Sequence, residues 1–287
     1  MIKYLLPLIL CLMLISVCIT RADTGLDFPG TAATTIRFKF TNPHLNGLPI
    51  YGTGGAGVTY IWKAYPRQKR LYYTTFFWGN DDGNGSICPT FYWVGSCSDA
   101  NTYYGAHPYP DWQGGSLWEI AVERNDYTNG AVVPNRWYTQ ALRVWSDASG
   151  KHHIFYWDLP NTDASHIVSR TSPTSYGNTN PPSPALTWGD APWNPRNEIY
   201  YGILRGIQIY SSLLSVSDMI SESTSPLSTS AGAANIWYLN TNPTPSDISD
   251  KSGKGHNPAW VGSGRPTLYT SGSGPSPSGP KGLRIMN

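Results

Sequence analysis

Short runs in which apolar and polar residues alternate recur along much of the chain, and they are rich in Tyr, Phe, Trp, Val and Ile. Alternation with a period of two is typical of strands that bury one face. Clusters of Gly, Asn and Asp, such as Asn80–Gly85 and Asp147–Gly150, separate these runs and predict turns. The predicted strands are Thr34–Thr41, Thr59–Trp62, Leu71–Trp78, Thr90–Val94, Leu117–Arg124, Trp137–Trp145, His153–Trp157 and Ile199–Tyr210. The pattern therefore predicts an all-β protein, a two-sheet antiparallel β-sandwich.

One short helix is predicted after the last long strand. Ser215 is a favoured N-cap residue and Asp218 follows at capping-box spacing, so we expect a helix from Ser215 to about Glu222. Beyond this point the composition changes to Ser, Thr, Pro and Gly. We expect a main sandwich over residues 23–222 and an extension over residues 223–287, which adds one or two strands or forms a small module of its own. Its end, SGSGPSPSGPKG, is linker-like and expected to be flexible.

The first 22 residues have the pattern of a secretory signal peptide. The apolar run Leu5–Ile19 is too short and too interrupted for a good membrane span. Small residues at the −3 and −1 positions predict cleavage before Asp23, and lipoprotein processing at Cys18 is the alternative. We therefore expect a secreted, extracellular protein, with the periplasm or the cell surface as alternative locations.

The charge and the hydropathy of the mature chain each exclude one class of partner. Residues 1–22 contain two of the 20 basic residues and none of the 18 acidic ones, so the mature chain is formally neutral. A neutral chain in which only 13% of residues are charged lacks the concentrated basic surface that nucleic-acid binding needs. The mature chain also has no second apolar stretch, so we expect neither a nucleic-acid partner nor a membrane span.

Two cysteines, Cys88 and Cys97, remain after the signal segment. In an exported chain, two cysteines at this short spacing predict a structural disulfide. A metal site is the rival interpretation, but it would need His or acidic partners at ligand spacing nearby.

Two segments carry a resemblance to a known family. Asn135–Pro160 contains a Trp, a strand, a D-x-S/G turn and a strand that ends in Tyr-x-Asp, and Gly202–Ile220 reads GILRGIQIYSSLLSVSDMI. Both are similar to laminin-G-like domains of the concanavalin A-like lectin and glucanase superfamily. The resemblance implies a two-sheet antiparallel jelly roll, and such domains include lectins, carbohydrate-binding modules, adhesion domains and hydrolases. The residues expected to fill its core are Trp137, Leu142, Val144, Phe155 and Ile207.

The segment Trp118–Glu123, WEIAVE, places two carboxylates on one face of a predicted strand, because Glu119 and Glu123 are four positions apart, an even offset. It resembles the E-I-D-x-E strand of family 16 glycoside hydrolases. That resemblance implies Glu119 as nucleophile and Glu123 as acid/base. The aspartate that orients the nucleophile in that family is Ala121 here. A solvated strand face is the alternative interpretation.

Aromatic residues gather in two predicted loops, where they could stack on sugar rings beside polar groups that bind hydroxyls. The first loop is Asn101–Trp112 and the second is Trp188–Trp193. The candidate ligand-binding residues are Tyr103, Tyr104, His107, Tyr109, Asp111, Trp112, Asp190 and Trp193. The alternative is that these aromatics cover a sheet edge.

No cofactor is predicted. Asp81 and Asp82 could hold a structural calcium ion, but the loop lacks the D-x-D-x-D-G spacing and a distal glutamate, so an ordinary hairpin turn is the favoured interpretation. Together these observations predict a secreted protein that binds polysaccharide or cell-surface glycan. The alternatives are a glycoside hydrolase or polysaccharide lyase and an adhesion module with a protein ligand.

Overall fold

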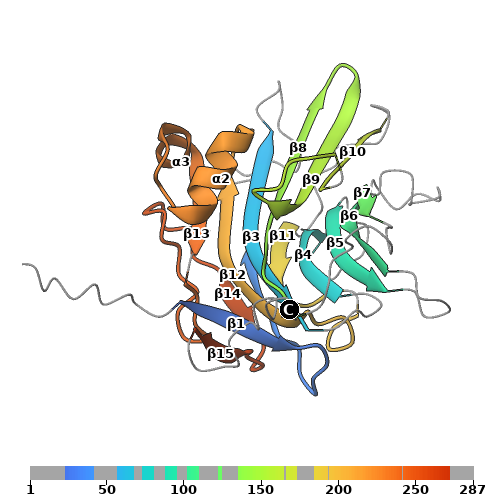
Figure 1. Ribbon diagram of the computed structural model, residues 1–287. Helices are drawn as coiled ribbons and strands as arrows, with labels where there is room; N and C mark the ends of the chain where they lie inside the picture. Colours follow the sequence, from blue (N-terminus) through green and yellow to red (C-terminus); the bar gives the residue numbers. More distant parts are fainter. Residues whose placement is uncertain are drawn as a thin grey trace, which may run out of the picture.

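The computed structural model of the chain describes residues 23–41, 57–67, 73–80, 88–95, 102–109, 122–124, 135–164, 166–172, 184–192, 194–240 and 242–271. Within these residues the chain forms two antiparallel sheets that pack face to face, together with two short helices (Figure 1). The prediction of an all-β, two-sheet sandwich is confirmed.

The order of strands in each sheet mixes early and late parts of the chain. Sheet A runs β10 (Ile167–Ser172), β9 (Gly150–Leu159), β8 (Tyr138–Asp147), β3 (Val58–Pro66), β12 (Tyr201–Tyr210), β1 (Thr24–Pro29) and β15 (Thr267–Thr270), and β13 (Ile236–Asn240) pairs with β12. Sheet B runs β14 (Ala259–Val261), β2 (Arg37–Thr41), β11 (Pro184–Trp188), β4 (Tyr73–Asn80), β5 (Cys88–Gly95), β6 (Thr102–Tyr109) and β7 (Val122–Arg124). The helices are α2 (Val216–Thr224) and α3 (Ser230–Asn235).

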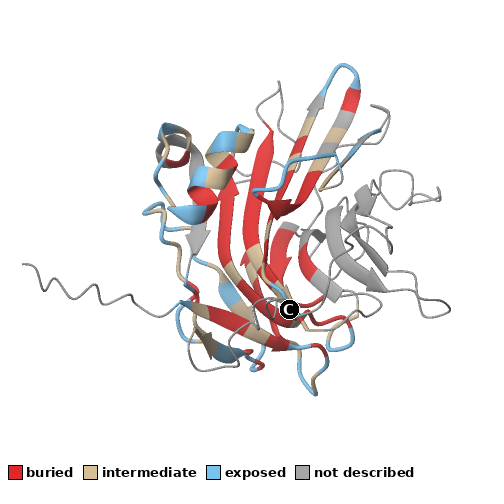
Figure 2. Cartoon of the chain, viewed as in Figure 1, coloured by how far each residue is buried: buried red, intermediate tan, exposed pale blue. Residues whose placement is uncertain are grey.

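Aromatic side chains fill much of the space between the sheets, because alternate residues of each strand point inward. Trp62 of β3 meets Phe76 of β4 edge to face, with ring centroids 5.5 Å apart. The Trp62 ring also lies 6.1 Å from Trp188 of β11 and stacks on Phe155 of β9. These rings therefore join sheet A to sheet B, and Figure 2 shows the strands around them as mostly buried.

Four of the five predicted core residues are buried between the sheets: Leu142, Val144, Phe155 and Ile207. The prediction for Trp137 is wrong, because this side chain is only half buried. Trp137 directly precedes Tyr138, whose side chain belongs to the core. Alternation along the strand therefore turns Trp137 to the outer face of sheet A.

Several strands differ from the predicted ones. Residues 102–109 were expected to be a loop, but they form strand β6, which pairs with β5 over its whole length. Strands β1, β10 and β11 were not predicted, because they are short and their apolar alternation is weak. Residues 117–121 of the predicted strand Leu117–Arg124 lie outside the described residues, and its end forms β7.

Residues 236–270 add strands to both sheets. Strand β13 pairs with β12, β14 pairs with β2, and β15 pairs with β1. The segment beyond Glu222 therefore contributes three strands where one or two were expected, and it completes the edges of the sandwich.

Helix α2 begins as predicted. The Ser215 hydroxyl accepts a hydrogen bond of 3.0 Å from the Asp218 backbone N–H, which is the N-cap interaction. Met219 of the helix packs with Ile61 and Tyr210 on the outer face of sheet A. In the described part of the chain neither helix combines the length and the apolar character needed to cross a bilayer.

Candidate functional site

Helix α2 packs on only part of the outer face of sheet A. Another part of this face carries a group of half-buried aromatic and charged residues. Lys63 and Tyr65 of β3 and Arg205 of β12 alternate along their strands with residues of the core, so they point away from it. Trp137 and Tyr269 of β15 lie on the same face. We call Tyr65, Trp137 and Tyr269 the aromatic platform.

The rings of the aromatic platform are in contact. The Trp137 ring centroid lies 5.4 Å from that of Tyr65 and 5.7 Å from that of Tyr269. Three strands separate β8 from β15 in the sheet order, which corresponds to about 19 Å across a flat sheet. Trp137 and Tyr269 nevertheless touch, because their large side chains extend toward each other over the intervening strands.

Charged side chains surround the platform. The Arg205 guanidinium lies 4.8 Å from the centre of the Trp137 ring and pairs with the Asp23 carboxylate at 2.5 Å. Burial lowers the pKa of Lys63, the nearby Arg205 lowers it further, and Asp23 acts in the opposite direction. The site thus combines apolar ring faces with cations and a carboxylate.

A neighbouring ion pair links the first strand to the end of β3. Arg67 pairs with Asp27 of β1 at 2.5 Å. Burial raises the pKa of Asp27, and the positive charge of Arg67 opposes that rise. The pair connects β1 to the end of β3 beside the platform. Because both side chains are partly exposed, it adds little to the stability of the fold.

Two glycines of β12 shape the strand beside the platform. Gly202 has φ of 143°, and a Cβ atom there would lie 2.1 Å from the Tyr65 carbonyl oxygen, so only glycine allows the close approach of β12 to β3. Gly206 has φ of 62° and lies where the β12–β3 register shifts, between Arg205 and Gln208. Such a bulge re-aims the neighbouring side chains.

The residues that the sequence nominated for ligand binding fall mainly on sheet B. Tyr103, Tyr104, His107 and Tyr109 belong to β6. Glu123 of β7 stands in register with Gly105 of β6. The backbone pairing therefore brings one of the two candidate catalytic glutamates next to the strand of candidate aromatic residues.

Other nominated residues lie outside the described part of the chain. These are Glu119, Asp111, Trp112, Trp193, Asp81, Asp82 and Cys97. Cys88 is the first residue of β5, and its backbone pairs with that of Tyr109. The catalytic pair, the calcium site and the disulfide therefore stay predictions.

Asp190 differs from its predicted role. Its side chain has no exposed surface, and its carboxylate accepts hydrogen bonds from the backbone N–H groups of Ile36 and Arg196 at 3.4 and 3.0 Å. Burial raises the pKa of Asp190 to about 6, against the opposing effect of these hydrogen bonds. Asp190 therefore fixes the loop that follows β11 and presents no surface to a ligand.

The hairpin between β8 and β9 brings Ser149, His152 and Asp147 together, but not as a catalytic triad. Ser149 Oγ and Asp147 Oδ1 both lie near the same ring nitrogen, His152 Nε2, at 3.1 and 2.9 Å. A triad needs the nucleophile and the carboxylate on opposite nitrogens of the ring. The His152 ring also stacks on Trp145, so this cluster stabilises the hairpin.

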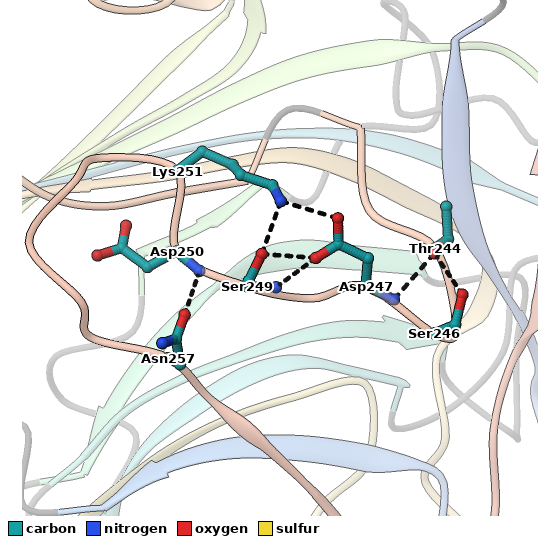
Figure 3. A network of polar contacts seen from close by, with 7 residues as sticks. All are labelled: Thr244, Ser246, Asp247, Ser249, Asp250, Lys251 and Asn257. Atoms are coloured by element: carbon teal, nitrogen blue, oxygen red, sulfur yellow. Dashed lines mark hydrogen bonds and ion pairs between the residues drawn. The ribbon is translucent and has the colours of Figure 1, made fainter.

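A second polar cluster orders the loop between β13 and β14 (Figure 3). The Asp247 carboxylate accepts hydrogen bonds from the backbone and hydroxyl of Ser249 and from Lys251, and these contacts lower the pKa of Asp247 to about 2. The Asn257 side chain accepts from the Asp250 backbone N–H. The polar groups of these residues therefore find their hydrogen-bond partners within the loop itself. In the residues that the structure describes, no three His, Cys, Asp or Glu side chains gather as a metal site.

Comparisons with known proteins give the fold alone. The sequence matches no described protein family and no curated protein. A crystal structure of a candidate carbohydrate binding protein from Bacteroides ovatus superposes with a TM-score of 0.50 and 12% identity, over 87% of this chain and 60% of that one. A heptameric SAP-like pentraxin from Limulus polyphemus superposes with a TM-score of 0.49 and 13% identity, over 86% of this chain and 94% of that one. The chain thus spans less than two thirds of the Bacteroides protein.

Sequence reasoning missed the aromatic platform. Tyr65 lies three residues beyond the predicted strand Thr59–Trp62, and Tyr269 lies in the extension 223–287, in which no strand was located. One feature of the sequence could have indicated it. Trp137 and Tyr138 are adjacent, and neighbouring residues of a strand point to opposite faces, so one of the two had to face outward. To predict which of these two rings faces outward, one must know which sheet packs against each of them.

Proposed function

We propose that this chain is an exported carbohydrate-binding protein and that the aromatic platform is its binding surface. The observation that carries the proposal is the half-buried Trp137 ring, flanked by Tyr65 and Tyr269 and held by Arg205. Sugar rings present apolar C–H faces that stack on aromatic rings, and their hydroxyls bind charged and polar groups beside those rings. The signal-like segment 1–22 supports export, and the fold shared with the Bacteroides ovatus protein is compatible with this function.

Replacing Trp137 by alanine is expected to weaken polysaccharide binding roughly 10- to 100-fold, since a stacked tryptophan at the centre of a site typically contributes about 2 kcal/mol or more. Affinity electrophoresis and pull-down on a panel of plant, algal and microbial polysaccharides measure this. Trp145→Ala is the matched control, because Trp145 is a half-buried tryptophan at the other end of β8. Equal binding by wild type and Trp137→Ala would remove the platform as the site and point to the aromatic residues of β6.

The second candidate function is glycoside hydrolysis by Glu119 and Glu123. The observation that favours it is the register of β7, which places Glu123 opposite Gly105, between Tyr103 and His107 in β6. If this candidate is right, the wild type releases reducing ends from a polysaccharide and Glu119→Gln loses that activity. A rise in absorbance at 235 nm would indicate a lyase. Retention on a polysaccharide without product, unchanged in Glu119→Gln, would leave binding alone for those substrates.

A further inference from the structure

Two cations face each other across strands at the edge of the platform. Lys63 of β3 and Arg205 of β12 are direct partners in the antiparallel register. Like charges at directly opposite positions destabilise a sheet. Both side chains are also partly removed from water, and that of Arg205 is only 15% exposed. The fold thus retains an unfavourable arrangement at a partly accessible surface.

The carboxylates nearby compensate these cations incompletely. Asp23 pairs with Arg205, and Asp27 pairs with Arg67. Among the described residues Lys63 forms no ion pair, and Arg205 Nε is buried without a hydrogen-bond partner. Among the described side chains around the platform, three cations (Lys63, Arg67 and Arg205) face two carboxylates (Asp23 and Asp27), so one positive charge is left over, and Lys63 carries it.

We infer that the ligand of the aromatic platform is an anionic glycan, whose carboxylate or sulfate group pairs with Lys63 while a sugar ring stacks on Trp137. This inference rests on the proposed function. An anion between Lys63 and Arg205 would convert the repulsion across the strands into two attractions, and partial burial strengthens such charge-assisted hydrogen bonds. A neutral sugar would leave the repulsion in place.

Two matched pairs of polysaccharides test the inference with the full mature chain. Polygalacturonate and its methyl ester differ in the carboxylate, and carrageenan and chemically desulfated carrageenan differ in sulfate. The acidic member of at least one pair is expected to bind about tenfold more tightly at low salt, and the preference should shrink as ionic strength rises. The pair that shows the preference identifies which anion is bound.

Variants assign the preference to Lys63. Lys63→Gln is expected to abolish it, so that the acidic and the neutral member of the pair bind equally. Lys254→Gln, in the exposed loop before β14, is the control and should retain it. Asp23→Asn removes the carboxylate that competes for Arg205, so it should tighten binding of the acidic polysaccharide several-fold.

The outcomes separate this inference from the function on which it rests. Equal binding of acidic and neutral members, lost in both cases by Trp137→Ala, would overturn the anionic ligand and leave carbohydrate binding intact. A preference that survives in Lys63→Gln would overturn the role of Lys63. Failure of every polysaccharide in the panel to bind would overturn the proposed function, and the inference with it.

Discussion

Replacing Glu222 by alanine is expected to lower the free energy of unfolding by about 3 kcal/mol, since roughly 1–3 kcal/mol is lost for each buried polar group left without a partner. Glu222 has no exposed surface. Its carboxylate accepts hydrogen bonds of 2.7 Å from the backbone N–H groups of Leu227 and Thr229. These contacts hold the turn between α2 and α3, so the variant leaves two N–H groups without their acceptor.

The Tyr210 hydroxyl is a third group in contact with Glu222. It lies 2.9 Å from Glu222 Oε2 and 2.5 Å from Gln208 Oε1, and its single proton can go to either. Burial and the negative charge of Glu222 raise the pKa of Tyr210 far above its usual range, so the hydroxyl stays protonated and remains a donor. Glu222→Ala therefore disturbs β12 as well as the turn.

Urea unfolding followed by tryptophan fluorescence measures the effect of Glu222→Ala. Ser221→Ala is the control, because Ser221 is an exposed residue of the same helix, and it should change stability by less than about 0.5 kcal/mol. Glu222→Gln keeps one oxygen acceptor and should fall between the wild type and the alanine variant. A loss below about 1 kcal/mol in Glu222→Ala would show that water replaces the carboxylate at low cost.

The sequence was informative about the fold wherever the alternation was strong. Leu142 and Val144 of β8 and Phe155 of β9 were correctly placed in the core, since each belongs to a long strand with one apolar face. The N-cap of α2 was also predicted from local chemistry, because Ser215 and Asp218 interact within one turn. Both signals are local, which is why a single sequence contains them.

The candidate site was less predictable, because it depends on contacts between distant segments. Arg205 contacts Trp137 and Asp23 only after β12 has been placed between β3 and β1. The sequence indicated Asp190 as a loop residue available to a ligand, but Ile36, 154 positions away, donates a hydrogen bond to it and residues 189–192 are buried. Periodicity states which residues share a face and does not state what covers that face.

The burial of Asp190 predicts an unusual dependence of stability on pH. Its folded-state pKa is about 6, above the ordinary value of 3.8, so between these values the folded protein holds a proton that the unfolded chain has released. The stabilisation is therefore complete below about pH 3.8 and is lost as pH rises to about 6. At 1.36 kcal/mol for each unit of pKa difference, the loss amounts to about 3 kcal/mol.

The measurement is the difference in unfolding free energy between wild type and Asp190→Asn at several values from about pH 4 to about pH 7, the window set by its pKa shift. The amide does not titrate, so the wild type should lose about 2.4 kcal/mol relative to the variant across this range, because part of the full effect lies below pH 4. Asp147 and Asp247, whose pKa values are lowered, contribute equally to both proteins and cancel. Asp27, whose pKa is raised, contributes equally to both proteins and cancels. A difference that stays constant with pH would mean that Asp190 is ionised throughout and that its backbone donors outweigh the cost of burial.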